Sequence, residues 1–223
     1  MENVSLTHIF ITLFVLIVAL TIHEAAHAWS ARALGDPTAH SQGRVSLNPI
    51  VHIDLVGTVL FPLFGLLFGY LGFGGVVFGW AKPVPVNVQN LKNPRQDHLL
   101  IAAAGPVSNI LQALVCLVGL YLFSWFLSLD EISSQFILVH LFTIFYWGLI
   151  LNVILAVFNL FPIPPLDGSW ILQGILPEKL TVVVEFFRPY GFLLLLMLLL
   201  TGIFGSVIET ILVLVREMVP QGF

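Results

Sequence analysis

The residues best placed to do chemistry form a His-Glu-x-x-His pattern made by His23, Glu24 and His27. On a helix, residues four apart lie on one face, so the two histidines can offer imidazole nitrogens to one metal ion. Glu24 is one residue along, near enough to act as a base toward a water at that metal without being a ligand. Because an apolar run that begins near Leu6 surrounds the pattern, the sequence predicts a metal site inside a membrane span.

A pair of polar residues on a helix can also serve only to bridge to a neighbouring helix. Ionisable groups are costly inside a membrane and usually have a function there, which favours the metal interpretation for His23 and His27. The other histidines lie near helix ends or in turns, and we interpret them as structural: His8, His40, His52, His98 and His140.

The composition indicates an integral membrane protein. The 223 residues are 58% hydrophobic and 9% charged, with a mean hydropathy of +1.02, whereas soluble domains carry about 25% charged residues. The net charge of -4 argues against a nucleic-acid partner. The one cysteine, Cys116, excludes an internal disulfide framework.

The first span is predicted from about Ser5 to Ala33. It is too long for a cleaved signal peptide and no Lys or Arg precedes it, so we expect it to be retained. His23 lies about 27 Å along this helix from Ser5. Arg32 and Arg44 follow the span, and the positive-inside rule therefore places the amino terminus outside and the histidine pair near the cytoplasm.

The apolar stretch from Leu55 to Trp80 contains seven glycines. Basic residues lie on both sides of it, Arg44 before and Lys82 and Lys92 after. A single crossing would put one group outside, whereas a re-entrant segment keeps both groups inside. Irregular backbone buried in protein also suits re-entry, so we favour it over a crossing.

The segment from Ala81 to Asn87 should be extended, because residues before proline avoid helical geometry. Pro83 and Pro85 remove donors from one edge, and Val84 and Val86 keep theirs on the other. The segment is either a stiff loop or an edge strand that binds an extended peptide.

Three further spans are predicted, from about Asp97 to Ser128, from about Phe136 to Leu160 and within Tyr190 to Val215. The expected fold is an all-α polytopic membrane protein with about four transmembrane helices, a glycine-rich re-entrant segment and a short membrane-associated β element. We expect one domain over residues 1–223, with a core of about 5–176.

A catalytic zinc ion usually takes three protein ligands. Asp167 is the best third candidate, because it follows the third span at the end that the charges assign to the cytoplasm. Glu178 and Glu185 are weaker candidates on what reads as a surface segment. Asn109, inside the second span, either joins two helices by a hydrogen bond or faces the metal cleft.

Several motifs together resemble the site-2 protease family of intramembrane zinc metalloproteases, peptidase family M50. They are His23 to His27, Gly105-Pro106-Val107-Ser108-Asn109 and Asn159 through Asp167-Gly168, with Gly43 to Pro49 and Gly79 to Val86 similar to its short bacterial members. The resemblance implies one zinc ion per chain held by His23, His27 and Asp167, with Glu24 as the catalytic carboxylate. It also implies that Asn109 and Asn159 bind substrate or stabilise the intermediate. The chain lacks the PDZ-like or CBS-like insert of some members, so their substrates and regulation do not carry over.

The sequence thus predicts a zinc-dependent endopeptidase of the cell membrane that cleaves single-pass or already cleaved transmembrane substrates, in regulated intramembrane proteolysis or in clearance of membrane remnants. Its oligomeric state is left open. One alternative is an intramembrane metal transporter, which should show polar groups along a whole path rather than at one depth. A second is a noncatalytic membrane chaperone, which the presence of Glu24 disfavours.

Overall fold

A computed structural model of the chain describes residues 6–71, 79–127 and 135–220, and this part is helical without a strand. The elements in chain order are α1 (Leu6–Ala33), α2 (Thr38–Ser41), η1 (Pro49–Val51), the π-helical η2 (Leu55–Leu60), α3 (Phe61–Tyr70), η3 (Val88–Asn90), α4 (Pro94–Phe126), α6 (Phe136–Leu160), α7 (Asp167–Ile175), α8 (Glu178–Phe187), η4 (Arg188–Tyr190), α9 (Gly191–Leu200) and α10 (Ile203–Met218).

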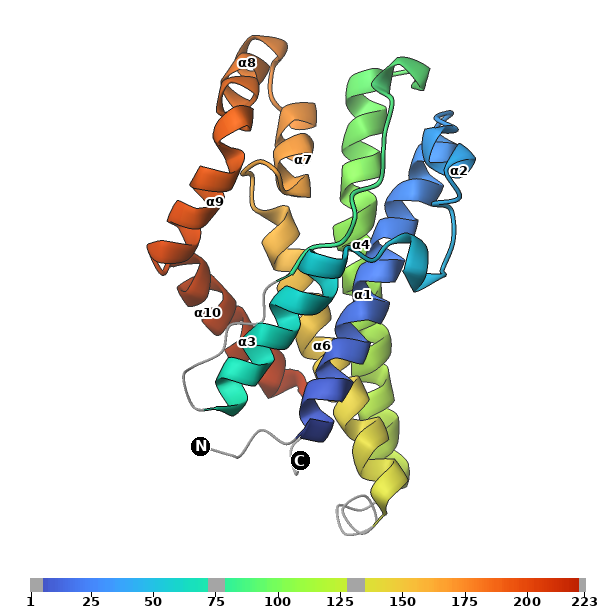
Figure 1. Ribbon diagram of the computed structural model, residues 1–223, viewed down its shortest axis with the longest axis vertical. Helices are drawn as coiled ribbons and strands as arrows, with labels where there is room; N and C mark the ends of the chain where they lie inside the picture. The colour runs from blue at the N-terminus through green and yellow to red at the C-terminus, as the bar shows by residue number, and fades with distance from the viewer. Residues whose placement is uncertain (1–5, 72–78, 128–134, 221–223) are drawn as a thin grey trace.

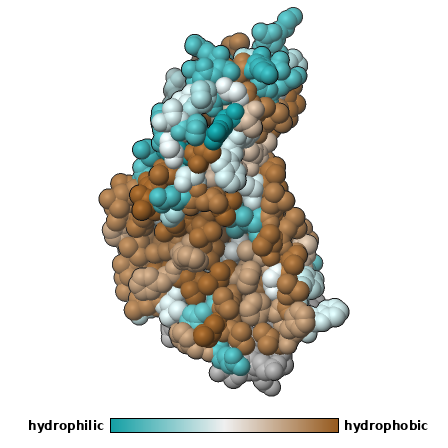
Figure 2. Space-filling view, turned by 90° about the vertical axis from the view of Figure 1, so that its right-hand side faces the viewer, coloured by the Kyte–Doolittle hydropathy of each residue, from teal (hydrophilic) through white to brown (hydrophobic). Residues whose placement is uncertain are grey.

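Among the described residues, four helical stretches are long and apolar enough to cross a membrane, which indicates a multi-pass membrane protein. They are α1, α4, α6 and the stretch Glu178–Leu200 formed by α8, η4 and α9. The helices α1, α4 and α6 pack against one another in a bundle, with α7 to α10 on one side (Figure 1). Hydrophilic residues gather at one end of the molecule, and most of the rest of the visible face is hydrophobic (Figure 2).

Small residues on α1 allow the bundle to pack closely, since Ala19, Ala28 and Ala31 are fully buried. On the α4–α6 contact, Gly119 lies directly against the ring of Phe145, where a Cβ would collide. Small residues at such contacts let helix backbones approach each other inside a membrane. This packing fixes the rotation of each helix and therefore which side chains face the interior.

The first and third spans lie where they were predicted, and α4 begins three residues before Asp97. The predicted end of the second span, Ser128, lies outside the described residues. The prediction of one continuous span within Tyr190 to Val215 is wrong. Gly202 adopts a positive φ of 74° between α9 and α10, and a left-handed residue ends the helix there.

The glycine-rich stretch begins with η2 and α3, a helix of about 24 Å at 1.5 Å per residue, shorter than the bilayer core. The chain is back beside its own start at Trp80, whose amide donates to the carbonyl of Gly57 (3.1 Å). The Thr58 hydroxyl in turn donates to the carbonyl of Trp80 (2.8 Å). A segment that enters and leaves the membrane on the same side must return to its own start in this way. Re-entry into the membrane itself stays a prediction.

The predicted β element is not found among the described residues, because residues 79–87 form no strand. The amides of Trp80 and Lys82 donate to Gly57 and His52, which belong to a helix start and a turn rather than to a strand. Pro83 and Pro85 have no amide hydrogen to donate. The segment therefore has no partner strand with which to form a ladder.

Candidate metal centre

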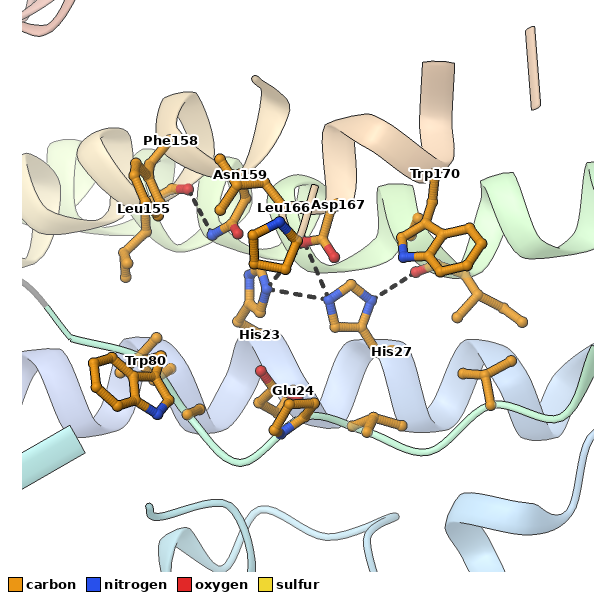
Figure 3. A pocket seen from close by; sticks show the side chains of 18 of the residues that line it. His23, Glu24, His27, Trp80, Leu155, Phe158, Asn159, Leu166, Asp167 and Trp170 are labelled. Atoms are coloured by element: carbon orange, nitrogen blue, oxygen red, sulfur yellow. Dashed lines mark hydrogen bonds and ion pairs between the residues drawn. The ribbon is translucent and has the colours of Figure 1, made fainter. Parts of the chain in front are cut away.

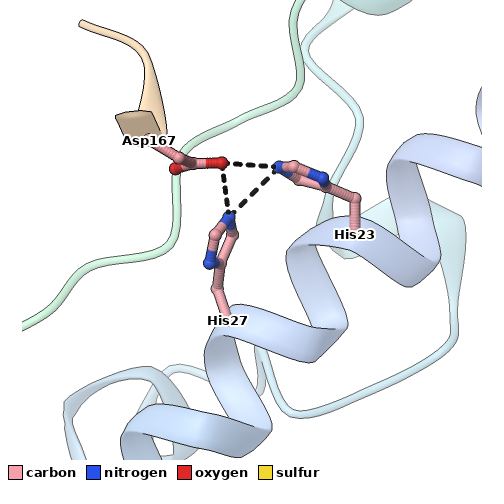
Figure 4. A group of neighbouring side chains, drawn as sticks. All are labelled: His23, His27 and Asp167. Atoms are coloured by element: carbon pink, nitrogen blue, oxygen red, sulfur yellow. Dashed lines mark hydrogen bonds and ion pairs between the residues drawn. The ribbon is translucent and has the colours of Figure 1, made fainter. Parts of the chain in front are cut away.

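Three side chains from two distant parts of the chain meet at one point (Figure 4). His23 and His27 come from successive turns of α1, and Asp167 is the first residue of α7. The Oδ2 atom of Asp167 lies 3.2 Å from Nε2 of His23 and 3.3 Å from Nε2 of His27, and the two Nε2 atoms are 3.1 Å apart. The three residues predicted as metal ligands are thus brought together by the fold.

The donor atoms of this group fit a metal ion. His27 Nδ1 lies 2.7 Å from the carbonyl oxygen of Ile101, which only accepts, so Nδ1 carries the hydrogen and Nε2 presents a lone pair. Asp167 Oδ2 is a buried atom, and its close polar neighbours among the described residues are the two Nε2 atoms. Tetrahedral zinc ligands about 2.0–2.1 Å from the metal lie about 3.3 Å apart, which matches the edges of this triangle.

The carboxyl group of Asp167 is held in its charged form. Burial by itself raises the pKa of Asp167, but the two imidazoles beside the carboxylate outweigh it, so the pKa lies below its usual range. A carboxylate and two imidazoles are the ligand types that zinc prefers at catalytic sites.

The approach of Asp167 depends on the short connection between α6 and α7. Three prolines in this connection, Pro162, Pro164 and Pro165, end helix α6 and prevent a new helix before Asp167. Gly168 follows directly, and a Cβ there would collide with the carbonyl groups of residues 160 and 161. The glycine lets α7 start against the end of α6, and this contact sets the position of the carboxylate.

Helix α4 closes the back of the centre at Gly105. A Cβ at this position would collide with the imidazoles of both His23 and His27. Pro106 follows inside the helix and is fully buried. The absence of a side chain at Gly105 lets α4 lie directly behind the two rings.

A cavity of about 440 Å³ opens in front of the centre (Figure 3). Glu24 lines it together with the two histidines and Asp167, and Glu24 is a buried residue. The far wall is apolar, with Phe158 of α6 and Leu195 of α9 among its residues. A carboxylate beside three converging ligand atoms, in a cavity with apolar walls, can move a proton in metal-assisted hydrolysis.

The extended segment 79–87 forms one wall of the cavity and is held at both ends. At one end, Arg44 donates to the carbonyl of Lys82 and the amide of Lys82 donates to the carbonyl of His52 (2.9 Å). At the other end, the carboxylate of Asp36 accepts from the amide of Asn87 (2.7 Å). All three anchoring residues are buried, so the wall is fixed from the protein side.

Val84 and Val86 lie between these anchors and line the cavity. Their amides donate no hydrogen bond to any described residue. Asn159 also lines the cavity, with its Nδ2 on the carbonyl of Leu155 (3.0 Å). These three residues therefore lie at the cavity in front of the metal centre.

Asn109 is in contact with the centre but does not line the cavity. It is fully buried behind His23, with its Oδ1 atom 2.6 Å from His23 Nδ1. Of the two predicted alternatives, the structure therefore shows the interhelical hydrogen bond, to His23 of α1 and Asn152 of α6, and not the cleft-facing position. Glu178 and Glu185 are exposed on α8, away from the ligand group, and Glu185 accepts a hydrogen bond from Gln173 (2.9 Å).

Sequence reasoning missed a stack of side chains at the edge of the cavity. His98 and Trp170 line it, with ring centroids 4.1 Å apart. The guanidinium of Arg188 lies 3.4 Å from the centroid of the Trp170 ring. His98 was interpreted as structural because nothing in the sequence shows that α4, α7 and η4 meet here.

Comparison with known proteins indicates that the chain is a metalloprotease. The family model "Peptidase family M50" matches residues 126–200, which include Asp167. The chain is 38% identical over 191 residues to "Putative zinc metalloprotease YwhC" of Bacillus subtilis (strain 168), covering 83% of this chain and 78% of the relative. It is 28% identical over 202 residues to "Putative zinc metalloprotease Rip2" of Mycolicibacterium smegmatis, covering 86% and 69%.

No solved structure is significantly similar to the chain. The extent of the match to YwhC is nonetheless sufficient to establish the family, and the paired histidines and the aspartate of the centre agree with it. The chain belongs to peptidase family M50, the metalloprotease family of the site-2 proteases.

Proposed function

We propose that the chain is a zinc-dependent endopeptidase that hydrolyses peptide bonds in or near transmembrane segments of other membrane proteins. The observation that carries this proposal is the triangle formed by His23 Nε2, His27 Nε2 and Asp167 Oδ2, with edges of 3.1–3.3 Å. One zinc ion per chain would be held by these three atoms.

Bound zinc would supply Lewis acidity, lowering the pKa of water and polarising the scissile carbonyl. Glu24, buried at the same cavity, takes a proton from the attacking water and delivers it to the leaving amine. Asn159 has a second amide hydrogen, besides the one donated to Leu155, that can reach the substrate carbonyl oxygen. The apolar walls keep bulk water out and strengthen these interactions.

A transmembrane helix hides its peptide bonds in its own hydrogen bonds, so a substrate must unwind before cleavage. The amides of Val84 and Val86 have no hydrogen bond to a described residue and lie along the cavity. Main-chain donors on a fixed extended segment can pair with an unwound peptide as a strand does. This supports single-pass or already cleaved membrane proteins as substrates.

We further propose that the centre lies toward the cytoplasm. Arg32 ends α1, Arg95 lies in the first turn of α4, and Lys179 and Arg188 lie in or next to α8. The carboxyl end of α1, the start of α4 and helix α8 lie at one end of the molecule (Figure 1), and hydrophilic residues gather at that end (Figure 2). Under the positive-inside rule, this end faces the cytoplasm.

Comparative membrane proteomics of wild type against Glu24→Gln, expressed in a strain lacking the native protein, tests the activity. Since Glu24 is not a ligand, the variant should bind zinc as wild type does yet accumulate uncut membrane proteins. A purified single-pass protein identified in this way should be cleaved only by wild type, and a zinc chelator should stop its cleavage. Equal cleavage by Glu24→Gln would refute the assignment, and zinc flux into liposomes without cleavage would favour a transporter.

A further inference from the structure

Two buried amides connect His23 to the main chain of another helix. His23 Nδ1 lies 2.6 Å from Oδ1 of Asn109 on α4. Asn109 donates from Nδ2 to Oδ1 of Asn152 on α6 (2.8 Å), and Asn152 donates from Nδ2 to the carbonyl of Gly148 (2.9 Å). The chain of hydrogen bonds therefore crosses from α1 to α6 through α4.

The direction of this chain is set at its far end. A carboxamide can present either its oxygen or its nitrogen to a neighbour, so an asparagine beside a histidine does not by itself select a tautomer. The carbonyl of Gly148 can only accept, which requires Asn152 to turn its nitrogen there and its oxygen toward Asn109. Asn109 must then present its oxygen to His23, and the hydrogen of the imidazole is placed on Nδ1.

The two amides have no alternative partner in solvent. Asn109 is 0% and Asn152 is 3% exposed, and a buried polar group without a hydrogen bond is costly, so each amide keeps its orientation. Gly148 permits the close approach of α6 to α4, since a Cβ there would collide with the Sγ atom of Cys116.

We infer that Asn109 and Asn152 act as positioning residues, a relay that holds His23 in the tautomer whose Nε2 is free to bind the metal. This inference rests on the proposed zinc site. The relay does for His23 what the carbonyl of Ile101 does directly for His27. Residues that orient metal-bound histidines typically contribute 10–100-fold to metal affinity.

Two substitutions of Asn152 distinguish the relay from simple packing. Asn152→Asp keeps an oxygen that accepts from Asn109, whether or not the new carboxyl is protonated, so the relay direction survives. Asn152→Leu has similar size but leaves Asn109 free to turn its nitrogen toward His23. The relay predicts that Asn152→Leu weakens zinc binding more than Asn152→Asp, whereas a packing role predicts that the buried leucine is the better tolerated.

The measurement is the dissociation constant of Zn²⁺ for purified full-length protein in detergent, by competition with a chelator. We expect an increase of about 10–100-fold for Asn152→Leu and Asn109→Leu, and less than about fivefold for Asn152→Asp. Ser108→Ala is the matched control, because Ser108 is buried beside Asn109 and bonds only its own helix at Gly105. Thermal unfolding of each zinc-free variant checks that the helices still pack.

The outcome separates the relay from the zinc site itself. If Asp167→Asn, measured in parallel, binds zinc as wild type does, the proposed site is wrong. If Asp167→Asn loses zinc while Asn152→Leu keeps wild-type zinc affinity, the zinc site stands and the relay is refuted. The same conclusion follows if Asp167→Asn loses zinc and Asn152→Asp binds zinc more weakly than Asn152→Leu does.

Discussion

Two cavities, each of about 440 Å³, lie between the same three helices α1, α4 and α6. The upper cavity holds the metal centre and is lined by later residues of α1, such as His23 and His27. The lower cavity is lined by earlier residues of α1, such as Val15 and Val18, together with Ile144 and Phe145 of α6. The two cavities therefore lie between the same helices and have similar volumes, but they differ in their depth along the bundle and in the chemistry of their lining residues.

The difference lies in the segments without regular secondary structure. The upper cavity adds walls from the extended segment 79–86 and from the connection that leads to Asp167. The lower cavity is lined by the three helices alone. Backbone without helical hydrogen bonds is tolerated at membrane depth only where it is buried in protein or lines a cavity. Helix α1 supplies two ligands and Glu24 here, whereas irregular segments position Asp167 and form one wall of the cavity.

Replacing one polar side chain in each cavity should give the largest contrast. Asp167→Asn removes a charged ligand, so we expect the zinc dissociation constant to rise by more than about 100-fold, beyond the effect of outer residues. Gln112 lines the lower cavity, and its Nε2 is buried without a partner among the described residues. Gln112→Leu should leave zinc affinity unchanged and not lower the unfolding temperature, because it removes an unpaired buried amide.

The zinc dissociation constant comes from chelator competition, and the unfolding temperature from melting in detergent. Zinc loss of similar size in Gln112→Leu would show that the Gln112 amide, and not only Asn152 among the residues that line the lower cavity, supports the metal centre.

Adding one methyl group to each of two α4 glycines should separate the metal centre from helix packing. Gly105→Ala places a Cβ against both imidazoles, whereas Gly119→Ala places it against the ring of Phe145. We expect the first to weaken zinc binding at least about tenfold, and the second to cost about 1–3 kcal/mol of stability without affecting zinc. Chelator competition and equilibrium unfolding report the two effects, and equal zinc affinity for both variants would contradict the geometry at Gly105.

A smaller effect is expected at the wall of the upper cavity. Val84→Pro removes an amide donor but keeps an apolar side chain, whereas Val84→Ala keeps the donor. If a substrate pairs with this amide, Val84→Pro should raise KM about fivefold, since one hydrogen bond contributes about 1 kcal/mol, with zinc affinity unchanged. Steady-state cleavage of a single-pass substrate measures KM, and a larger increase for Val84→Ala would indicate recognition by the side chain instead.

The smallest effect concerns the anchor of this wall at Asp36. Burial raises the pKa of Asp36, but hydrogen bonds from Thr38, Asn90 and Asn87 outweigh it and hold the pKa below its usual value. The stabilisation is therefore complete above the ordinary pKa of about 3.9 and is lost as the pH falls through the lowered value.

The free energy of unfolding of wild type minus that of Asp36→Ala should be constant near neutral pH and shrink below about pH 4. Denaturant melts at several pH values measure this difference. The same difference for Gln112→Leu should not depend on the pH, because no titrating group is removed; a parallel decline in both would assign the effect to other carboxylates.

Local patterns in the sequence were sufficient for helices α1 and α6. The bounds of α6 and the carboxyl end of α1 agree with hydrophobic runs that can be read directly. The apolar run after Tyr190 led to the wrong prediction of one continuous span, because hydrophobicity alone does not show the left-handed turn at Gly202. The prolines at 83 and 85 indicated an extended chain, but whether such a chain forms a strand depends on partners far away in sequence.

The sequence by itself determined the two histidines and Glu24, because a spacing of four residues fixes their relative positions within one helix. It also placed Asp167 at the matching end of another span. Only the tertiary structure decided that Asn109 lies behind His23, that Asn152 orients it, and that Trp170 and His98 stack beside the cavity. Each of these depends on the rotation of one helix against another, which packing across the bundle sets and no local pattern records.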